Sequence, residues 1–582
     1  MNAIIIKNGK VFTGYDQPSK ISNILIKDGI VVEMSEKEIH LKNAKVIDAS
    51  GKWVMPGFID NHTHYDAEVL VAPSLGESVR HGVTTVLLGG CSLSFVTADV
   101  EDCCDMFTRV EAFPREILFP ILEKQKNWST PKEWINHINS LNIGPNLATF
   151  LGHSDIRAKV MGIDRSLNKS EIPTDEEIQK MTNLLEDALD NGFLGISMQH
   201  NPWDKMDGHH WSKLLPAAYA KSKERNALTE VVRKREAHLQ GVPDLVNRVA
   251  ALWYMTQSAS WGFRKKLKTS MVAMMNLKGD PYIRGLLSGI ASFFNKIGRA
   301  DFRMQAFPVP FTNYAKGMDL VIFEEFPTGE LARHLSRDIQ KRNITLKDPE
   351  YRKQFKKHYK DKLSPKVWQK DFGDAFVINA PDKSWIGKSF LDLAKERNQH
   401  PVDTFLDTVI DLDQQVEWKT TIGNHDPLKL GKLYNDPNGI IGFADSGAHI
   451  NNMAFYNLGI RMLTYVKDSH ERGKPFMSIE KAVWRLTKEN ADFFNIDAGT
   501  IEAGKRADIA VIDPDKLTDS VHEYHKTEFL SGMERLVNRD DEAVYAVLIN
   551  GKIAWENHKF SEQFGKERFG EFLRGKHLSK KS

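Results

Sequence analysis

The sequence predicts an α/β fold, a TIM-like (β/α)8 barrel with a small β-sandwich domain built from both termini and a helical insertion. In the middle of the chain, short apolar runs alternate with amphipathic segments, as in parallel βαβ units. At both ends, short alternating strands are separated by turn dipeptides instead. We therefore expect a β-sandwich domain from 1–55 plus 496–566, a barrel over 56–495 with a helical subdomain inserted at about 328–402, and a flexible tail at 567–582.

The terminal domain is predicted from matching β signals. Alternating apolar residues surround Asn8-Gly9 and Asp28-Gly29 near the N-terminus and Asn550-Gly551 near the C-terminus. Asn-Gly and Asp-Gly favour the two-residue turns of β-hairpins, because these residues tolerate positive φ. Since the same pattern occurs at both ends, we expect the two ends to pair in one β domain.

The barrel is predicted from apolar runs that have the length of buried strands. The amphipathic stretch at 175–192 is typical of the helices between them. A charged stretch after 328 has helical spacing without an apolar strand, so we assign it to the insertion. The expected strands are GVTTVLLGG (82–90), PNLATFLGH (145–153), GFLGISM (192–198), NALTEVV (226–232), SMVAMMN (270–276), DLVIFEEF (319–326) and GIIGFAD (439–445).

Size and charge exclude several classes of protein. With 582 residues and 41% hydrophobic content, the chain can bury a large core, which excludes a disordered or fibrous protein. Lysine and arginine number 79 against 77 acidic residues, a net charge of +2 that gives no overall attraction to nucleic acid or anionic lipid. The basic runs 264–266 and 356–357 are interpreted as solvated charge.

Cysteine usage and hydropathy bear on the compartment. Cys91, Cys103 and Cys104 are too few and too clustered for a disulfide framework, and they fit a reducing environment. Neither a signal peptide nor a run of roughly 18 apolar residues is visible. We therefore expect a cytoplasmic protein that acts on a small molecule, with no nucleic-acid or membrane partner. Whether it forms a homo-oligomer stays open, because sequence does not locate apolar patches.

The strongest functional signal is the segment PGFIDNHTH, in which an apolar strand ends in His62 and His64. On a strand, positions i and i+2 share one face, so both imidazoles can bind one metal ion. In a (β/α)8 barrel, the end of a strand belongs to the face that carries the active site. We therefore predict a metal site at these two histidines.

Two further strand ends carry groups suited to the same site. GIIGFAD ends in Asp445, which could ligate the metal and accept a proton from bound water. The alternative for Asp445 is an Asx turn that caps the next segment. GVTTVLLGG is followed by Cys91, whose thiolate could join the metal, and its alternative is a small buried residue at a tight turn.

Several segments together resemble one family. These are PGFIDNHTHYD, the GVTTV strand with its cysteine, NLATFLGHSDIRAKVMG, GFLGIS, GFADSGAH and GTIEAGKRADIAVID. Over nearly its whole length, the chain is similar to the amidohydrolase superfamily, specifically to its D-aminoacylase (N-acyl-D-amino-acid deacylase) branch. The resemblance implies a zinc-dependent amide hydrolase with one or two divalent ions. It also implies His62, His64 and Cys91 as metal ligands, with Asp445 as catalytic aspartate and further ligand.

Two histidine ligands of the family are missing from this chain. Glu230 occupies the place of the first, where a carboxylate can still bind zinc or a harder metal. The alternative for Glu230 is a salt-bridged barrel residue. At the place of the second, the chain has Asn276 and Lys278. The role of Lys278 stays open among a modified side chain, a partner of Glu230 and a cation near the site.

Four residues are assigned to substrate binding. His153 and Arg157 match the Gly-His-x-x-x-Arg segment of the family, and His449 ends GFADSGAH. His425 lies in a loop, where barrels keep specificity residues, with a hydrogen-bonded loop residue as the alternative. Further candidates in loops or as carboxylate-binding arginines are His200, Trp203, Asp204, His209, His210, His238 and Arg461.

The predicted function is metal-dependent hydrolysis of the amide bond in an N-acyl amino acid, of the D series. Asp445 would take a proton from the attacking water and return it to the leaving amine. A cyclic amide or another C–N bond is the first alternative, because a superfamily constrains the reaction more than the substrate. The second is a degenerate scaffold, which the two missing histidines favour and the retained cluster argues against.

Overall fold

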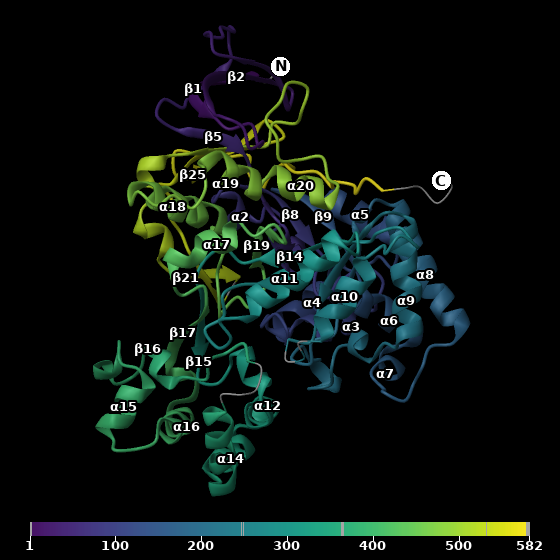
Figure 1. Ribbon diagram of the computed structural model, residues 1–582, viewed down its shortest axis with the longest axis vertical. Helices are drawn as coiled ribbons and strands as arrows, with labels where there is room; N and C mark the ends of the chain where they lie inside the picture. Colours follow the sequence, from purple (N-terminus) through teal and green to yellow (C-terminus); the bar gives the residue numbers. More distant parts are fainter. Residues whose placement is uncertain (1–2, 246, 248, 362–365, 531, 578–582) are drawn as a thin grey trace.

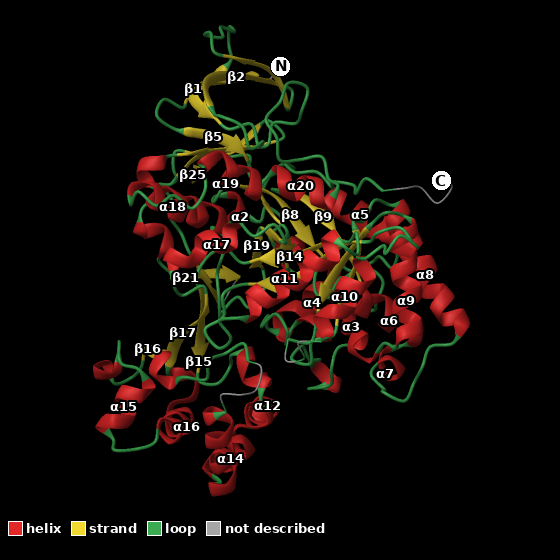
Figure 2. Cartoon of the chain, in the orientation of Figure 1, coloured by secondary structure: helices red, strands yellow, loops and turns green. Residues whose placement is uncertain are grey.

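The computed structural model describes residues 3–245, 247, 249–361, 366–530 and 532–577, and it has a mixed α/β fold (Figure 1). A sheet near the N-terminus, a large central body and a separate lobe follow one another along the long axis (Figure 2). In the described part of the chain, no helix combines the length and the apolar character that crossing a bilayer requires.

Strands from both ends of the chain form a single nine-stranded sheet in the order β25-β24-β23-β20-β5-β1-β2-β3, with β4 paired to β1. The two halves join where β5 and β20 pair antiparallel, with Met55 opposite Ala510. The strands are β1 (Ala3–Val11), β2 (Lys20–Lys27), β3 (Ile30–Ser35), β4 (Lys45–Asp48), β5 (Trp53–Pro56), β20 (Ile509–Ile512), β23 (Val544–Ile549), β24 (Lys552–Glu556) and β25 (Lys559–Phe560).

The turn dipeptides have two different roles in this sheet. Asp28-Gly29 and Asn550-Gly551 have positive φ and connect antiparallel strands, as their sequence indicates. Asn8-Gly9 does not form a hairpin turn. It produces a bulge inside β1, where the register shifts between Ile6 and Gly9 and the Asn8 N–H donates to Asn23 Oδ1.

The central body contains parallel strands, three of which are interrupted by the single residues Asn61, Phe150 and Gly442. The pairings run from β6 through β8 to β9, and from β10 through β11, β12, β13 and β14 to β18, while β19 pairs with β7. The strands are β6 (Phe58–Asp60), β7 (His62–Thr63), β8 (Val83–Leu88), β9 (Asn146–Thr149), β10 (Leu151–Gly152), β11 (Gly195–Gln199), β12 (His238–Val242), β13 (Lys268–Met274), β14 (Asp301–Ala306), β18 (Gly439–Ile441) and β19 (Phe443–Ser446).

Helices separate or flank these strands, and a hairpin of β21 (His525–Leu530) and β22 (Met533–Val537) adjoins them. The helices of this body are α1 (Glu68–Val71), α2 (Gly76–Val79), α3 (Val100–Phe107), α4 (Arg115–Gln125), α5 (Pro131–Ser140), α6 (His153–Met161), α7 (Ile163–Ser166), α8 (Asp175–Asp190), α9 (Ser222–Lys234), α10 (Ala250–Ser258), α11 (Ile283–Lys296), α17 (Leu430–Tyr434), α18 (Leu458–Glu471), α19 (Ile479–Leu486) and α20 (Lys488–Phe494).

Two expected strands are wrong. Residues 226–232 lie in α9, where Leu228 and Val232 are buried four residues apart and so form one helical face. Residues 319–326 contain a 3-10 helix at Val321–Glu325. In both cases a short apolar run gives no period by which a strand and a buried helix could be distinguished.

The inserted lobe is larger than the expected 328–402 and is not purely helical. It extends over 311–423, because an antiparallel sheet of β15 (Phe311–Lys316), β17 (Glu417–Gly423) and β16 (Ala375–Asn379) leads into and out of it. Strands β15 and β17 were missed because they lie outside 328–402 and contain few large apolar residues, whereas β16 lies within that range as a short apolar run. Its helices are α12 (Pro327–His334), α13 (Ile339–Lys347), α14 (Pro349–Lys360), α15 (Phe390–Glu396) and α16 (Pro401–Leu412).

The C-terminal segment is packed where a flexible tail was expected. Phe569 and Leu573 are buried, and the N–H of Leu573 donates to the carbonyl of Leu147 in β9 at 2.7 Å. The expectation of a flexible tail is therefore wrong for 567–577, since this segment buries apolar side chains and bonds to the edge of β9. Residues 578–582 lie outside the described residues.

Candidate metal centre

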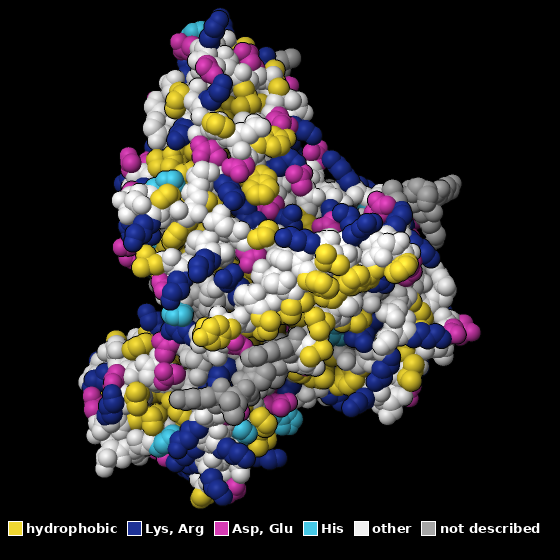
Figure 3. Space-filling view, viewed as in Figure 1, with side chains coloured by type: hydrophobic (Ala, Val, Ile, Leu, Met, Phe, Trp, Pro, Cys, Tyr) yellow, Lys and Arg dark blue, Asp and Glu magenta, His cyan; other side chains and the backbone are white. Residues whose placement is uncertain are grey.

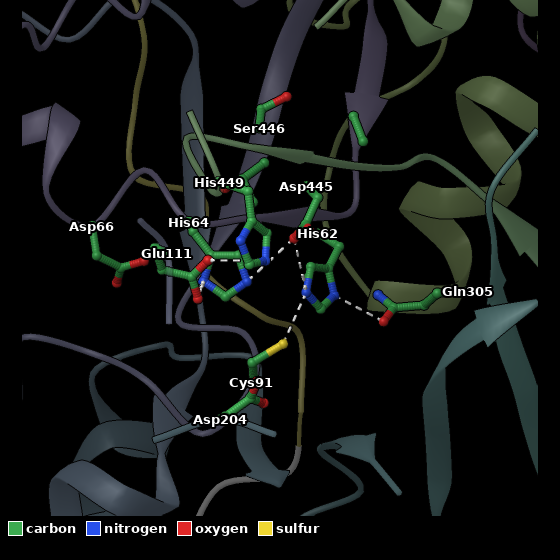
Figure 4. Close-up of polar contacts among 12 residues, drawn as sticks. His62, His64, Asp66, Cys91, Glu111, Asp204, Gln305, Asp445, Ser446 and His449 are labelled. Atoms are coloured by element: carbon green, nitrogen blue, oxygen red, sulfur yellow. Dashed lines mark hydrogen bonds and ion pairs between the residues drawn. The ribbon is translucent and has the colours of Figure 1, made fainter. Parts of the chain in front are cut away.

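The ends of three neighbouring strands bring His62, His64, Cys91 and Asp445 together (Figure 4). The histidines come from β7 and the residue after it, the cysteine from the turn after β8, and the aspartate from β19. Because β7 pairs with β19 and β6 pairs with β8, groups far apart in sequence emerge side by side. The spacing His-x-His predicts the common direction of the two imidazoles, and the strand pairings bring the other two groups beside them.

One donor atom from each of His62, His64 and Cys91 lies within 4.8 Å of the other two. His62 Nε2 is 3.2 Å from the sulfur of Cys91. Asp445 Oδ1 is 3.3 Å from His64 Nε2 and 3.7 Å from His62 Nε2. Two imidazoles, a thiol and a carboxylate thus surround one small volume.

The turn that carries Cys91 is built by glycine. Gly89 has φ +72°, and a Cβ there would come 2.2 Å from the carbonyl oxygen of Phe150, so a larger residue cannot fit. A Cβ on Gly90 would lie 3.3 Å from the ring of His62. Cys91 itself has φ +50°, and its N–H donates to Gln240 Oε1 at 3.1 Å. This bond holds the thiol against the histidine.

Asp445 is held in a left-handed conformation, with φ +56°. Asp60, in β6, accepts hydrogen bonds from Ser446 Oγ at 2.7 Å and from the N–H of Ala444 at 3.2 Å. Burial raises the pKa of Asp60 to about 7, against the opposing effect of its hydrogen bonds with Ser446, Ala444 and His62. The first strand thereby fixes the residues on both sides of the candidate catalytic aspartate.

Burial and mutual charge set the protonation of the cluster. Burial lowers the pKa of His62 to about 4, so that this imidazole is neutral, the form that binds metal. For His64, burial is outweighed by Glu111, Cys91 and Asp445, which together raise its pKa well above the usual value. Burial opposes ionisation of Asp445. However, His64 donates a hydrogen bond to this carboxylate and carries a positive charge, and both effects hold the pKa of Asp445 below its usual value. Burial raises the pKa of the Cys91 thiol to about 12.

Sequence reasoning missed three polar residues beside the cluster. Glu111 Oε1 is 3.2 Å from His64 Nδ1, and burial raises the pKa of Glu111 to about 8. Gln305, at the end of β14, lies 3.0 Å from His62 Nδ1. Gln240, in β12, contacts the cysteine turn. Glu111 lies in an irregular loop without a motif, whereas Gln305 and Gln240 lie in strands, where their polarity was the available signal.

His449 also lies at this site. Its Nε2 is 3.9 Å from Glu111 Oε2, and its N–H donates to the carbonyl of Glu111. Burial lowers the pKa of His449 to about 4, against the opposing charge of Asp445. The substrate assignment of His449 is therefore compatible with its position.

Glu230 does not reach the cluster, and its assignment as a ligand is corrected. Its side chain lies on the outside of α9, 49% exposed, and forms an ion pair with Arg233. Lys278 pairs with Asp374 of the inserted lobe at 2.6 Å instead of with Glu230. Strand β12 directs Gln240, and no acidic residue, toward the cysteine turn.

The histidine and the arginine of the Gly-His-x-x-x-Arg segment pair with one buried carboxylate. His153 Nε2 is 2.7 Å from Glu224, and Arg157 forms an ion pair with the same carboxylate. All three side chains are fully buried. His425 is exposed, in the loop that returns from the inserted lobe. The structure therefore does not bring His153, Arg157 or His425 into contact with the metal ligands.

Asp155, which lies between His153 and Arg157 in the sequence, organises the loop after Cys91. Its carboxylate accepts hydrogen bonds from three backbone N–H groups and two hydroxyls of residues 94–98. Asp155→Ala leaves these buried donors without an acceptor, so we expect the free energy of unfolding to fall by about 3–5 kcal/mol. Chemical denaturation measures this change. The exposed Asp164→Ala is the matched control, and a loss for Asp155→Ala no larger than for the control contradicts the interpretation.

The donor set fits a divalent metal ion. Two imidazoles and a thiol are the ligands that zinc prefers, and a nearby carboxylate can complete the set. Glu111 Oε2 is buried and has no hydrogen-bond partner among the described residues, although it lies in the same cluster. Unsatisfied buried polar atoms are costly, which is expected at a site that binds an ion or a substrate.

Comparisons with known proteins agree with this geometry. Models described as amidohydrolase family match residues 45–238 and 391–554. An uncharacterized protein of Mycobacterium tuberculosis (strain H37Rv) is 44% identical over 568 residues, covering 96% of this chain and 93% of the relative. A D-aminoacylase of Alcaligenes xylosoxydans xylosoxydans is 22% identical over 579 residues, covering 96% of each chain.

Two solved structures share the fold. A D-aminoacylase superposes with a TM-score of 0.63 and 18% identity, over 98% of this chain and 99% of the other. An N-acyl-D-glutamate deacylase from Bordetella bronchiseptica, solved with zinc and a phosphonate inhibitor, gives the same TM-score, identity and coverage. The resemblance predicted from the sequence motifs is confirmed.

Proposed function

The chain belongs to the amidohydrolase superfamily, in its D-aminoacylase branch, and on this premise we propose that it is a metal-dependent hydrolase of N-acyl amino acids of the D configuration. The convergence of His62, His64, Cys91 and Asp445 carries the proposal. The solved relative that contains zinc supports a divalent ion, which we propose to be zinc.

In this proposal, His62, His64 and Cys91 would hold the ion, with the Asp445 carboxylate beside His62 and His64. The chemistry that a divalent ion would supply there is Lewis-acid polarisation of the scissile carbonyl and a lower pKa of water. The ionised Asp445 accepts a proton from the water that attacks the carbonyl carbon. As the C–N bond breaks, the same carboxyl group returns the proton to the leaving nitrogen. The products are a carboxylic acid and a free amino acid.

The strand pairings support a (β/α)8 barrel as the scaffold. All pairings among the parallel strands follow one sequence order, and the pair β7–β19 links the last strand to the first. We propose that the three interrupted strands each count as one, which makes eight strands in a closed ring. The cluster then lies at the carboxyl ends of the strands, where such barrels carry their sites.

The ligand cysteine must stay reduced to bind metal. Cys91, Cys103 and Cys104 are all free in the structure. This supports a cytoplasmic location, which we propose for the protein.

We propose Arg225 as the group that binds the substrate carboxylate. Arg157 and Arg461 are already bonded, to Glu224 and to Tyr524 respectively. Arg225 lies in the first turn of α9, near the carboxyl end of β11, and stacks on the ring of Trp253. Its Nη1 lies 3.2 Å from Nε2 of His200, and its buried Nε has no hydrogen-bond partner among the residues that the structure describes. A planar guanidinium in this state is suited to a carboxylate.

Arg225→Ala is expected to raise KM by roughly tenfold to a hundredfold and to change kcat much less, because it removes binding shared by ground and transition states. Arg225→Lys should recover part of the loss, since it keeps the charge without the planar fork. Steady-state kinetics with an N-acyl-D-amino acid measures both constants. The control is Arg165→Ala, because Arg165 is already ion-paired with Glu177. A lower kcat with unchanged KM would contradict this role.

A substrate panel tests the proposed function. It compares N-acetyl-D-amino acids, their L counterparts and cyclic amides such as hydantoins, with release of a free amine or ring opening as the readout. We expect hydrolysis of the D compounds. Cleavage of cyclic amides alone would place the chemistry on another C–N bond, and no hydrolysis by metal-loaded protein would favour the degenerate scaffold.

A further inference from the structure

Helix α11 presents an apolar face to the outside of the molecule. Tyr282, Leu286, Phe293 and Ile297 recur at intervals of four, seven and four residues, which places them on one side of the helix. Their exposed fractions are 85%, 52%, 52% and 64%. The opposite side of α11 buries Ala291 and Phe294 against the central body. The helix is therefore apolar on both sides, although only one side is covered.

Two aromatic residues from the preceding loop extend this face. The ring of Trp261 lies 6.4 Å from the ring of Phe293, and the Trp261 N–H donates to the carbonyl of Gly298 after α11. Phe263 follows it and is 94% exposed. We call the exposed set the α11 patch, and it consists of Trp261, Phe263, Tyr282, Leu286, Phe293 and Ile297. Figure 3 shows a band of hydrophobic side chains over the part of the surface where Figure 1 places α11.

The charge around the α11 patch is predominantly positive. Residues 249–299 contain eight lysines and arginines and one acidic residue, a net charge of 8 − 1 = +7, whereas the whole chain has +2. Arg264, Lys265 and Lys266 adjoin Phe263, and Lys296 and Arg299 flank Ile297, all exposed. Lys265, Lys266, Lys278 and Arg284 form ion pairs with acidic residues outside this range, so half of the eight cations are neutralised within the chain. The net charge that remains around the α11 patch is still positive.

We propose that the α11 patch binds the surface of an anionic lipid bilayer. Exposed tryptophan, tyrosine and phenylalanine on a helical face, with lysine and arginine at its margin, form the pattern of a protein surface that lies in the membrane interface. Anionic headgroups complement the cationic margin. A second copy of the chain would instead bring two cationic margins together across a two-fold interface, which costs energy.

This proposal does not rest on the proposed enzymatic function. It revises two expectations from the sequence, that the run 264–266 is only solvated charge and that the protein has no membrane partner. Neither could be judged without the fold, because the aromatic residues and cations come together from a loop and a helix. The net charge of the whole chain hides the local surplus.

Sedimentation with lipid vesicles tests the proposal on the full chain. Vesicles of phosphatidylcholine alone are compared with vesicles that also contain phosphatidylglycerol, at low and high salt. We expect binding to the anionic vesicles, weakened by salt. Phe263→Ser/Phe293→Ser should weaken binding roughly tenfold or more, because two apolar side chains no longer enter the interface. Lys296→Glu/Arg299→Glu should weaken it by roughly fivefold for each cationic charge removed.

The control Ile172→Ser/Ile344→Ser removes two exposed apolar residues outside the α11 patch and should bind as the unchanged protein does. Light scattering measures the mass of each protein in solution, which is compared with the 66.2 kDa of one chain. The proposal is overturned if the unchanged protein does not sediment with anionic vesicles, or if the patch variants bind as well as it does. A dimer that the patch variants dissociate, with no vesicle binding, would also overturn it and assign the patch to a second copy.

Discussion

Asp445→Asn is expected to lower kcat by roughly a thousandfold while the metal stays bound. The substitution keeps the size of the side chain and one acceptor oxygen but removes the charge that accepts a proton. The contacts of Ser446 and Ala444 with Asp60 do not involve the Asp445 side chain, so the strand should keep its position. The measurement is steady-state kinetics beside metal content per chain.

The surface substitution Asp519→Asn is the control for Asp445→Asn, since Asp519 is exposed and lies in the C-terminal part of the chain. Near-normal turnover of Asp445→Asn would remove the proton-transfer role. Loss of both metal and turnover would instead assign Asp445 mainly to binding the ion. The two readouts together therefore separate the catalytic and the ligand roles that the sequence assigned to one residue.

His62→Ala/His64→Ala should reduce hydrolysis to the background, a loss of roughly ten thousandfold or more, because two of the three metal donors are removed. Added zinc should not restore activity at concentrations that saturate the unchanged protein. The exposed pair His40→Ala/His558→Ala is a matched control, since it removes two imidazoles that lie outside the candidate metal centre. Retained hydrolysis in the double variant would mean that the chemistry needs no metal at this cluster.

The part of the site that sequence could predict is the part that lies on strands. His62 and His64 share a strand face by their spacing, and Cys91 and Asp445 follow apolar runs, so their convergence needs only parallel pairing. Glu111 could not be predicted, because it reaches His64 from an irregular loop whose path depends on packing. The ligand roles of the cluster remain predictions, since distances alone do not show a bound ion.

The failures concern residues whose environment is set by tertiary contacts. Glu230 was assigned because it occupies the place of a family histidine, but its run forms a helix with one buried and one exposed face. His153 and Arg157 were assigned from a motif, and the structure shows that this motif surrounds one buried carboxylate, Glu224. A motif thus marks residues that matter to the fold without saying which of them meet the substrate.

The mixed α/β class could be predicted from alternation, whereas boundaries could not. The turn dipeptides at 28–29 and 550–551 identify hairpins, but the same signal at 8–9 produces a bulge because the chain continues in the same strand. The inserted lobe begins and ends in strands whose pairing is internal to the lobe, so the charged helical stretch indicated only its centre. Short runs carry too little periodicity to decide such cases.

The most direct test of the central claim is the metal content per chain of protein purified without chelator, measured by mass spectrometry. The account predicts one or two tightly bound divalent ions in the unchanged protein and in Asp445→Asn, and their loss in His62→Ala/His64→Ala. A site that stays empty in the unchanged protein after addition of zinc or manganese, or metal retained in full by the double variant, would contradict it.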